Sequence, residues 1–363
     1  QDSIRNAQGG IITGRDVSLN AGGDIINERT ATYYESSSQP AGLSGIKALA
    51  GISSLLRGIG GSASDSGTVL DNAARIEATN DLDMHAGGNL INQGAVLQAD
   101  GDARLSAGQD LVIGAVEETS SSLRKDRRHH WESSQTTQHG SEVTVGGDLQ
   151  AQAGNDLAVI ASRIDVGGDA SLNAAGDVTL ISAANEQHNV YRYRRSDKKV
   201  TRENSLVEQQ GAEVLAGGDV VVASGQDMTL VASRIQTAGD VGLYADGDIN
   251  LLSGLDEQSS YYMKQEKKSF GRSSARQSES YTSTNVATQV EAGGNLLVNV
   301  SLEDQGRVIL EGGQNVTIIG SQLTAGEDLA VGALGNVTVL SGVEEHGSYS
   351  KKSDSGFLGL SRS

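Results

Sequence analysis

The feature that most constrains the fold is a repeated phrase in which an Asp or Asn follows a glycine-rich turn and precedes alternating apolar residues. In "AGGDVVVASGQDMTL", residues 216–230, Asp219 and Asp227 hold this marker position. Successive markers lie 8, 13 and 8 residues apart in three sets, while a fourth set lengthens the first step to 20. The markers are Asp16, Asp24, Asp81, Asn89, Asp102, Asp110, Asp148, Asp156, Asp169, Asp177, Asp219, Asp227, Asp240, Asp248, Asn295, Asn315, Asp328 and Asn336. A fixed period of this length is typical of a solenoid.

Each 21-residue unit reads as one coil with three strands. Two marker phrases supply two strands, and an apolar anchor eight residues beyond the second marker supplies the third, at Leu97, Ile164, Ile235 and Leu323. Gly and Asx residues are expected to form left-handed corners and local side-chain hydrogen bonds. Nine coils, spaced by about 4.8 Å, make a rod about 45 Å long. We therefore expect an all-β fold, a right-handed parallel β-helix with about 21 residues per coil.

The interior of such a rod can be checked in the sequence. Residues one and three positions after each of the 18 markers should point inward, and 34 of these 36 are Ala, Val, Leu, Ile or Met. The exceptions are Asn27 and Asn92. The same register places Val222 inside and Ser224 on an exposed turn. The phrase therefore indicates a structural repeat and not a binding site.

Composition agrees with one continuous β-helix over residues 1–363. Gly accounts for 47 residues and Pro for one, Pro40, which suits many corners and few interrupted strands. There is no Cys, no signal peptide and no apolar run long enough to span a bilayer. Neither end carries an obvious polar cap, so we expect the chain to be a piece of a longer protein.

Long polar segments interrupt the repeat at one corner of every second coil, each introduced by an acidic residue. Ser, Thr, Tyr and Gln alternate along their arms, which predicts two-stranded hairpins. They occupy 117–142, 185–211, 256–289 and, truncated by the end of the sequence, 344–363. Hairpins that leave the same corner two coils apart should stand side by side as a flatter second sheet.

The hairpin tips differ in charge from the rod. Windows 123–131, 191–202 and 263–276 hold 15 of the 28 basic residues and carry +3, +5 and +4, within a chain of net charge −18. All 12 aromatic residues except Tyr244 lie in the insertions. Candidate contacts with a partner or membrane are Arg124, Arg127, Arg128, Trp131, Tyr191, Arg192, Tyr193, Arg194, Arg195, Lys198, Lys199, Tyr261, Tyr262, Lys264, Lys267, Lys268 and Phe270.

Two interpretations of these tips stay open. Cross-strand aromatic and charged pairs stabilise exposed hairpins without any ligand. Basic residues interleaved with aromatic ones also stack on sugar rings or bind anionic head groups.

The first insertion, residues 28–70, carries a different pattern. Apolar residues recur at helical spacing in it, at Leu43, Ile46, Leu49, Ile52, Leu56 and Ile59. The stripe is too short to span a bilayer, so we expect a short helix that docks on the flank of the rod or lies at a membrane interface.

Catalysis and metal binding are not expected. An acid–base pair needs carboxylates outside the repeat register, and only Glu303 and Asp304 meet that condition. His129 and His130 are neighbours on a strand and point to opposite faces, so at most one can join His139. The sequence predicts no enzyme, no cofactor and no metal site.

The phrases "AGGDVVVASGQDMTLVASRIQTAGDVGLYADGDINLLSG" and "GNVTVLSGVEEHGSYSKKSDSGFLG" resemble the haemagglutinin repeats of filamentous haemagglutinin and of contact-dependent growth inhibition effectors. The likeness extends over almost the whole chain. Its Glu-led, Ser- and Lys-rich hairpins are similar to the second repeat block of the toxin-delivering proteins. The helix-like stripe in residues 40–60 departs from that pattern.

The resemblance implies a large exoprotein, exported through an outer-membrane two-partner transporter and displayed on a Gram-negative cell. It also implies contact with the target cell's outer membrane and an attached C-terminal toxin outside this sequence, with no nucleic-acid partner. Two functions follow as hypotheses. The chain is a structural and translocation segment for the toxin, or an adhesin that binds surface glycans or lipopolysaccharide through the tips.

Overall fold

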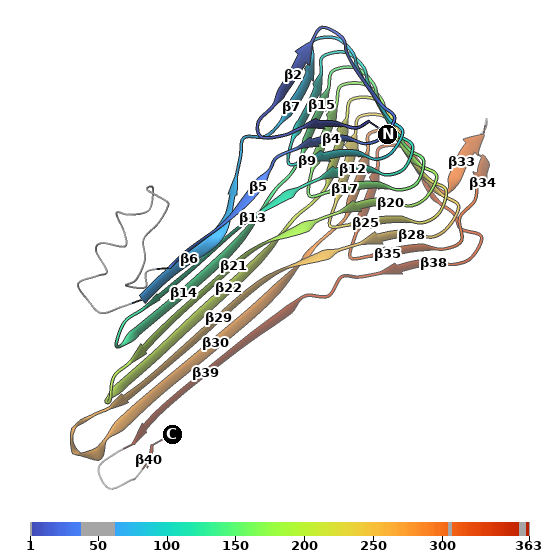
Figure 1. Cartoon of the computed structure of the whole chain (residues 1–363). Coiled ribbons are helices and arrows are strands. Elements are labelled where there is room, and N and C mark those ends of the chain that lie inside the picture. Colours follow the sequence, from blue (N-terminus) through green and yellow to red (C-terminus); the bar gives the residue numbers. More distant parts are fainter. Residues whose placement is uncertain (1, 38–61, 304–306, 356–360, 363) are drawn as a thin grey trace.

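The computed structural model describes residues 2–37, 62–303, 307–355 and 361–362. In these residues the chain is almost entirely β-strand (Figure 1). Three parallel sheets form the sides of a triangular rod, and an antiparallel sheet extends from one corner. The expected β-helix with hairpins on every second coil is confirmed.

The three rod sheets are named A, B and C. Sheet A contains, in spatial order, β1 Ile4–Asn6, β4 Ile25–Glu28, β9 Leu90–Gln93, β12 Leu111–Gly114, β17 Leu157–Ile160, β20 Val178–Ile181, β25 Met228–Val231, β28 Ile249–Leu252, β35 Val316–Ile319 and β38 Val337–Leu340. Sheet B contains β2 Ile11–Gly14, β7 Arg75–Ala78, β10 Val96–Ala99, β15 Glu142–Val145, β18 Arg163–Val166, β23 Glu213–Ala216, β26 Arg234–Thr237, β31 Gln289–Ala292 and β36 Gln322–Ala325. Sheet C contains β3 Val17–Ala21, β8 Leu82–Ala86, β11 Ala103–Ala107, β16 Leu149–Ala153, β19 Ala170–Ala174, β24 Val220–Ser224, β27 Val241–Ala245, β32 Leu296–Val298 and β37 Leu329–Val331. Sheets B and C have nine strands each, as nine coils require.

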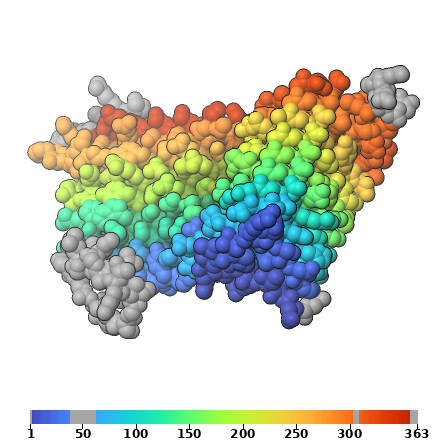
Figure 2. All heavy atoms as spheres, turned by 90° about the horizontal axis from the view of Figure 1, so that it is seen from above, coloured from blue at the N-terminus to red at the C-terminus, as the bar shows by residue number. Residues whose placement is uncertain are grey.

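The hairpin sheet contains β5 Ala31–Ser37, β6 Ser62–Leu70, β13 Val116–Lys125, β14 His129–His139, β21 Ala183–Arg194, β22 Lys198–Gln210, β29 Gly254–Lys267, β30 Ser273–Val286, β39 Glu345–Ser355 and β40 Ser361–Arg362. A 3₁₀ turn, η1 Ser269–Gly271, closes the β29–β30 hairpin. In Figure 2 the coils appear as bands in sequence order, and each hairpin lies in the band of its own coils. The sheet is therefore assembled by the rod, because the coils set the spacing of the hairpins.

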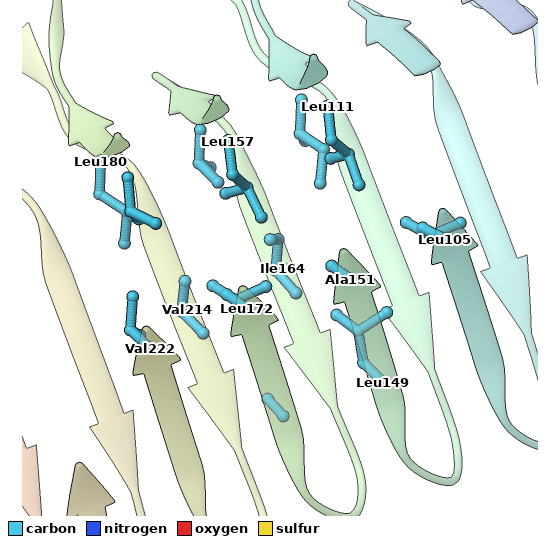
Figure 3. Close-up of a cluster of buried hydrophobic side chains, with 14 of the residues drawn as sticks. Leu105, Leu111, Leu149, Ala151, Leu157, Ile164, Leu172, Leu180, Val214 and Val222 are labelled. Carbon is cyan, nitrogen blue, oxygen red and sulfur yellow. The ribbon is translucent and has the colours of Figure 1, made fainter. Parts of the chain in front are cut away.

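The core of the rod consists of stacked aliphatic side chains. In Figure 3, Leu157, Ile164 and Leu172 point inward from sheets A, B and C, and all three side chains are fully buried. The predicted inward positions are all buried except five in the outermost coils, namely Leu19, Leu329, Val331, Val337 and Val339. These coils have a neighbour on only one side among the described residues. The register derived from the markers is correct.

The markers act differently from what we expected. Each marker from Asn89 to Asn336 donates its backbone N–H to the side-chain Oδ1 of the marker one coil earlier, as Asp169 does to Asp148 at 2.9 Å. None of the described markers has positive φ. The expectation of local turn hydrogen bonds and left-handed marker corners is wrong. The markers form two ladders along the rod that tie successive coils together.

The glycine before the marker Asp169 leaves no room for a side chain beside this ladder. A Cβ on Gly168 would lie 2.1 Å from the Asp148 Oδ1, the atom that accepts the ladder hydrogen bond. Left-handed residues occur instead at the corner between sheets A and B, in coils without a hairpin: Gly94, Ala161, Ala232 and Gly320. In the alternate coils the hairpin leaves from this same corner. In the first coil the same corner holds two left-handed residues, Gln8 and Gly9, so the corner is closed either by one or two left-handed residues or by an inserted hairpin.

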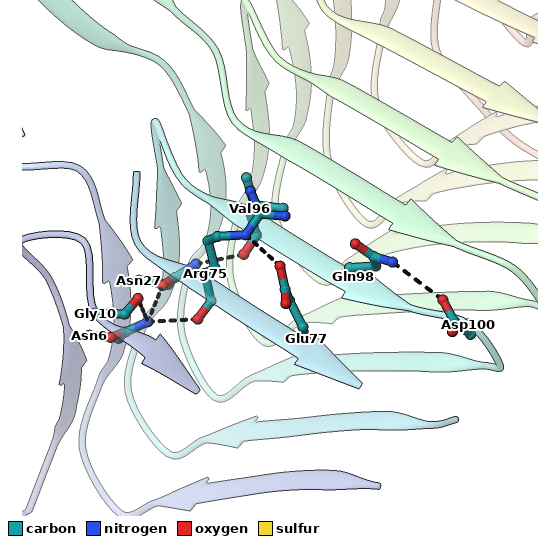
Figure 4. Close-up of polar contacts among 8 residues, drawn as sticks. All are labelled: Asn6, Gly10, Asn27, Arg75, Glu77, Val96, Gln98 and Asp100. Carbon is teal, nitrogen blue, oxygen red and sulfur yellow. Dashed lines mark hydrogen bonds and ion pairs between the residues drawn. The ribbon is translucent and has the colours of Figure 1, made fainter. Parts of the chain in front are cut away.

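The two polar exceptions of the interior form a ladder with Asn6, and Figure 4 shows the Asn6–Asn27 step of it. Asn6 Nδ2 donates to Asn27 Oδ1 at 2.9 Å, and Asn27 Nδ2 donates to Asn92 Oδ1 at 2.7 Å. All three side chains are buried. Since the amides satisfy one another, they are tolerated in an apolar interior.

The local structure at Ser224, in the first insertion and in the fourth marker set departs from the regular repeat. Ser224 is buried, and its Oγ donates to the carbonyl oxygens of Gly176 and Asp227, so its predicted exposed turn position is wrong. The first insertion begins and ends with the paired strands β5 and β6, a hairpin stem that we did not expect there. Its predicted helical stripe, Leu43 to Ile59, lies outside the described residues. The lengthened step of the fourth set forms a small hairpin, β33 Val300–Glu303 with β34 Arg307–Leu310, and Asp304 lies outside the described residues.

Candidate functional site

The hairpin tips are the best candidate site, because there the charges and rings of the insertions meet on adjacent strands. Residues paired directly across antiparallel strands share one face of a sheet, and neighbours along a strand alternate between faces. The pairs Trp131–Tyr191, Tyr191–Arg202 and Arg202–Tyr262 place one row on one side, which we call the aromatic face. The pairs Lys125–His130, His130–Arg192 and Arg192–Thr201 place another on the opposite side, the basic face.

The aromatic face carries a cluster of four rings from β14 and β21. The His129 and Trp131 rings stack with centroids 4.9 Å apart, and Trp131 and Tyr191 lie 5.7 Å apart. His129 also lies 5.0 Å from Tyr193. Two cations lie over rings on this side, Lys198 over Tyr193 at 5.9 Å and Arg202 over Tyr262 at 5.6 Å. The cluster links two hairpins, as the cross-strand interpretation predicts.

The basic face holds an open groove of about 600 Å³. It extends across the tips of β13, β14, β21, β22 and β29. Its lining includes five cations for which no ion pair is found among the described residues: Lys125, Arg127, Arg128, Arg194 and Lys199. Arg194 donates its backbone N–H to the Arg128 carbonyl oxygen at 2.8 Å, which joins the two turns. Val200, Thr201, Met263 and Gln265 line it from β22 and β29, and His129, His130, Arg192 and Tyr193 line it from β14 and β21. The groove is therefore cationic with a few uncharged polar groups.

One carboxylate, Asp126, lies in this groove. Its Oδ1 accepts the backbone N–H groups of Arg128 and His129, both at 2.7 Å, and its Oδ2 lies 2.9 Å from His129 Nδ1. These contacts, with the Arg128 backbone hydrogen bond the strongest, lower the pKa of Asp126 to about 2. The carboxylate holds the turn and orients His129, and its single negative charge offsets only one of the five cations that line the groove without an ion pair among the described residues.

Other cations that the sequence selected as candidate contacts form ion pairs. Arg192 bonds Glu203 at 2.9 Å, Lys264 bonds Glu266 at 2.9 Å, and Arg195 forms a short contact with Asp197. The hydrogen bond that Arg195 donates to Asp197 raises the pKa of Arg195, and the one that Lys264 donates to Glu266 raises the pKa of Lys264. These side chains lie at the surface and are at least partly exposed, so such pairs contribute little to stability. They do divide the tip cations into paired and unpaired sets.

The tip of the β29–β30 hairpin lies outside both the ring cluster and the groove. Phe270 in η1 has a φ of 63° and is 80% exposed, and it follows Lys267 and Lys268 at the end of β29. Neither Lys267, Lys268 nor Phe270 lines the groove, and Tyr261 lies on the basic face away from it, opposite Glu203. Arg124 pairs with Trp131 and therefore belongs to the aromatic face.

No metal centre is found in the part of the chain that the structure describes. His129, His130 and His139 each face a different carboxylate, on Asp126, Glu132 and Glu118. Among the same residues, no helix has the length and apolar character of a membrane span.

Sequence reasoning found most of the tip residues and missed their division into two faces. It did not select Lys125, which lines the groove, or His129 as a member of the ring cluster. Alternation along a strand could have shown this division, because it places Tyr191 and Tyr193 on one face of the sheet and Arg192 and Arg194 on the other. The pairing between hairpins, such as Trp131 with Tyr191 and Arg202 with Tyr262, depends on how separate coils align, which no single arm reveals.

The chain is similar to known proteins over nearly its full length. The family described as hemagglutinin repeat matches residues 2–128, 124–196, 191–273 and 268–362. The deoxyribonuclease CdiA of Dickeya dadantii (strain 3937) is 27% identical over 344 residues, which cover 94% of this chain and 9% of the relative. The tRNA nuclease CdiA of Escherichia coli (strain STEC_O31) is 31% identical over 274 residues, 75% of this chain and 8% of the relative.

A hemolysin of Proteus mirabilis is 23% identical over 292 residues, 71% of this chain and 18% of that protein. The chain thus spans less than a fifth of the length of these relatives. No solved structure matches it.

Proposed function

From the premise that this chain belongs to the hemagglutinin-repeat family, we propose that it is a structural and translocation segment of a large contact-dependent growth inhibition exoprotein. In this role the rod is a stiff carrier displayed outside a Gram-negative cell after export through an outer-membrane two-partner transporter. The toxin that it helps deliver lies outside this sequence. The segment itself is not an enzyme.

Two kinds of observation support the proposal. Several relatives are named as CdiA nucleases, and the part of them that this chain resembles is repeat sequence. The rod is a continuous stack of coils tied by two marker ladders, which suits a load-carrying spacer.

The observation that carries the proposal is the hairpin sheet. It is a single layer of ten strands that extends away from the rod (Figure 1). Its tips concentrate the positive charge of a chain whose total is −18. Outer membranes present dense negative charge, so a basic edge held away from an acidic rod is suited to contact them.

The test is flotation of the purified chain with outer-membrane vesicles. Charge reversal at the five tip cations Arg192, Arg194, Arg195, Lys198 and Lys199 should abolish most association while leaving thermal unfolding unchanged. Binding should weaken as salt rises, because exposed charges are screened. Unchanged flotation of the reversed variant at all salt concentrations contradicts the membrane role.

An adhesin function is the second candidate, and the aromatic face favours it. Trp131 and Tyr191 offer adjacent ring faces of the kind on which sugars stack, with Arg202 in the same row. An adhesin predicts saturable binding that free sugar competes and that Trp131→Ala removes. The translocation segment predicts vesicle association that free sugar leaves intact.

A further inference from the structure

We propose that the groove on the basic face is a binding site for phosphate groups carried on a saccharide. This proposal deepens the proposed function. It rests on that function because contact with an outer membrane is what brings the tips to the ligand. The site is formed by the turn between β13 and β14 and by the tip ends of β14, β21, β22 and β29.

The first step is the charge of the groove. Five of its cations, Lys125, Arg127, Arg128, Arg194 and Lys199, have no ion pair among the described residues. Its carboxylate, Asp126, accepts two backbone N–H groups and contacts His129, and its one negative charge leaves the groove with an excess of positive charge. Clustered like charges repel, and a bound polyanion removes that cost.

The second step is the arrangement of the donors. Arg194 and Lys199 pair directly across β21 and β22, and Lys199 pairs with Gln265 on β29, so their side chains project from the same face in adjacent strands. Arg128 lies beside them, because its carbonyl oxygen accepts the Arg194 N–H. Guanidinium groups bind phosphate through two parallel hydrogen bonds, and an ammonium binds it as a point charge. Two guanidinium groups and a lysine at adjacent strand positions therefore suit more than one phosphate.

The third step is the uncharged floor. Thr201 and Gln265 offer hydrogen-bonding groups, and Met263, which pairs with Thr201, adds apolar surface. A groove of about 600 Å³ falls in the range that accepts small organic ligands rather than bare ions. Sugar hydroxyls match the hydroxyl and amide groups, so a phosphorylated saccharide uses the whole groove.

Most of the aromatic face lies outside this site, and of its ring cluster only His129 and Tyr193 line the groove. Trp131, Tyr191 and Arg202 project from the opposite side of the sheet. A ligand in the groove does not stack on those rings. This separation supplies a matched control, since charges can be removed from either face of the same hairpins.

The experiment is titration calorimetry on the full chain with glucose 1,6-bisphosphate as the probe and glucose as its neutral counterpart. The groove variant is Arg194→Gln with Lys199→Gln. The control is Arg202→Gln with Lys264→Gln, which changes the net charge by the same amount on the aromatic face. We expect the groove variant to bind the bisphosphate at least about tenfold more weakly, the control to bind like the original chain, and glucose not to bind.

Two further arms identify the source of the phosphate. Phosphatidylcholine vesicles that contain phosphatidic acid present the same phosphate as a lipid head group, and weaker competition by them than by the soluble sugar supports a saccharide ligand. Tighter binding of a single-stranded oligonucleotide than of the bisphosphate, or stronger competition by the vesicles, overturns it. An equal loss of bisphosphate affinity in the groove variant and the control also overturns it. Such a result shows that the net charge of the chain, and not the groove, determines binding.

The outcome is separable from that of the proposed function. A groove variant that loses bisphosphate binding but still floats with outer-membrane vesicles supports the groove and leaves membrane contact to other tip residues. A groove variant that keeps bisphosphate binding disproves the groove, whether or not the chain floats.

Discussion

The rod and the hairpin sheet are both β-structure, yet they are stabilised in different ways. In the rod, coil after coil buries aliphatic side chains such as Leu157 and Val222. In the outer part of the hairpin sheet, only Val190 and Val200 are buried apolar residues among those described. The hairpins depend instead on backbone hydrogen bonds, cross-strand pairs and attachment to the rod. A sheet that need not bury either face is free to present two chemically distinct surfaces.

The largest effect is expected when a charge is placed on one side or the other of a rod strand. Val222 is fully buried and its neighbour Val221 is 38% exposed on the other face of β24. Val222→Asp should lower the free energy of unfolding by about 4 kcal/mol or more, because the carboxylate has no partner. Val221→Asp should change it by about 0.5 kcal/mol or less. Chemical denaturation followed by circular dichroism measures both, and equal losses would show that the inside and outside of the rod are misassigned.

The Asn ladder tests whether the core tolerates polar groups only as a set. Asn27→Val should lower the free energy of unfolding by about 1–3 kcal/mol, because the Asn92 Oδ1 loses its donor. Adding Asn92→Val should cost less than the sum of the two single changes, since the orphaned oxygen is removed as well. Denaturation of both single variants and the double variant completes the cycle, and strict additivity would argue against the ladder.

The marker ladder predicts a smaller effect at a single coil contact. Asp169→Ala should lower the free energy of unfolding by about 1 kcal/mol, because the Asp219 N–H loses its acceptor. Asp169→Asn keeps an Oδ1 in place and should be close to neutral, as Asn89 and Asn295 hold the same position. If the Ala and Asn variants melt at the same temperature, the acceptor role is wrong.

In the hairpin sheet, deletion of a large ring should be almost invisible to global unfolding. Trp131→Ala removes contacts with His129 and Tyr191 worth about 1 kcal/mol, but these stabilise a tip that opens separately from the rod. We expect an unchanged main transition and faster amide exchange at the tips of β14 and β21. A large drop in the main transition would mean that the two regions unfold as one unit.

The smallest expected effect is a pH response confined to one turn. The folded pKa of Asp126, about 2, lies below the ordinary value of 3.8, so its contribution is present above pH about 4 and lost as the pH falls through about 2. Trp131 fluorescence should report this loss, because His129 joins the Asp126 turn to the Trp131 ring. Asp126→Ala should remove the step, and a step that persists in this variant would belong to another group.

Much of the architecture is determined by the sequence alone. The 21-residue period, the aliphatic residues after each marker and the polar insertions at one corner predict a nine-coil β-helix with hairpins, and the structure has them. These features are local: alternation within one strand decides which side chain is buried, and one polar arm following another predicts a hairpin. The same alternation predicts that adjacent tip residues, such as Tyr193 and Arg194, point apart.

Contacts between coils were decided by the tertiary structure. The marker carboxylates bind backbone N–H groups of the next coil, as Asp169 does for Asp219, 50 residues away, and not the turn beside them. The groove likewise exists because Arg194, Lys199 and Gln265 fall into register across three strands from two hairpins. Such partners are set by how separate coils align, and that alignment results from burial of the whole core rather than from any short stretch of the chain.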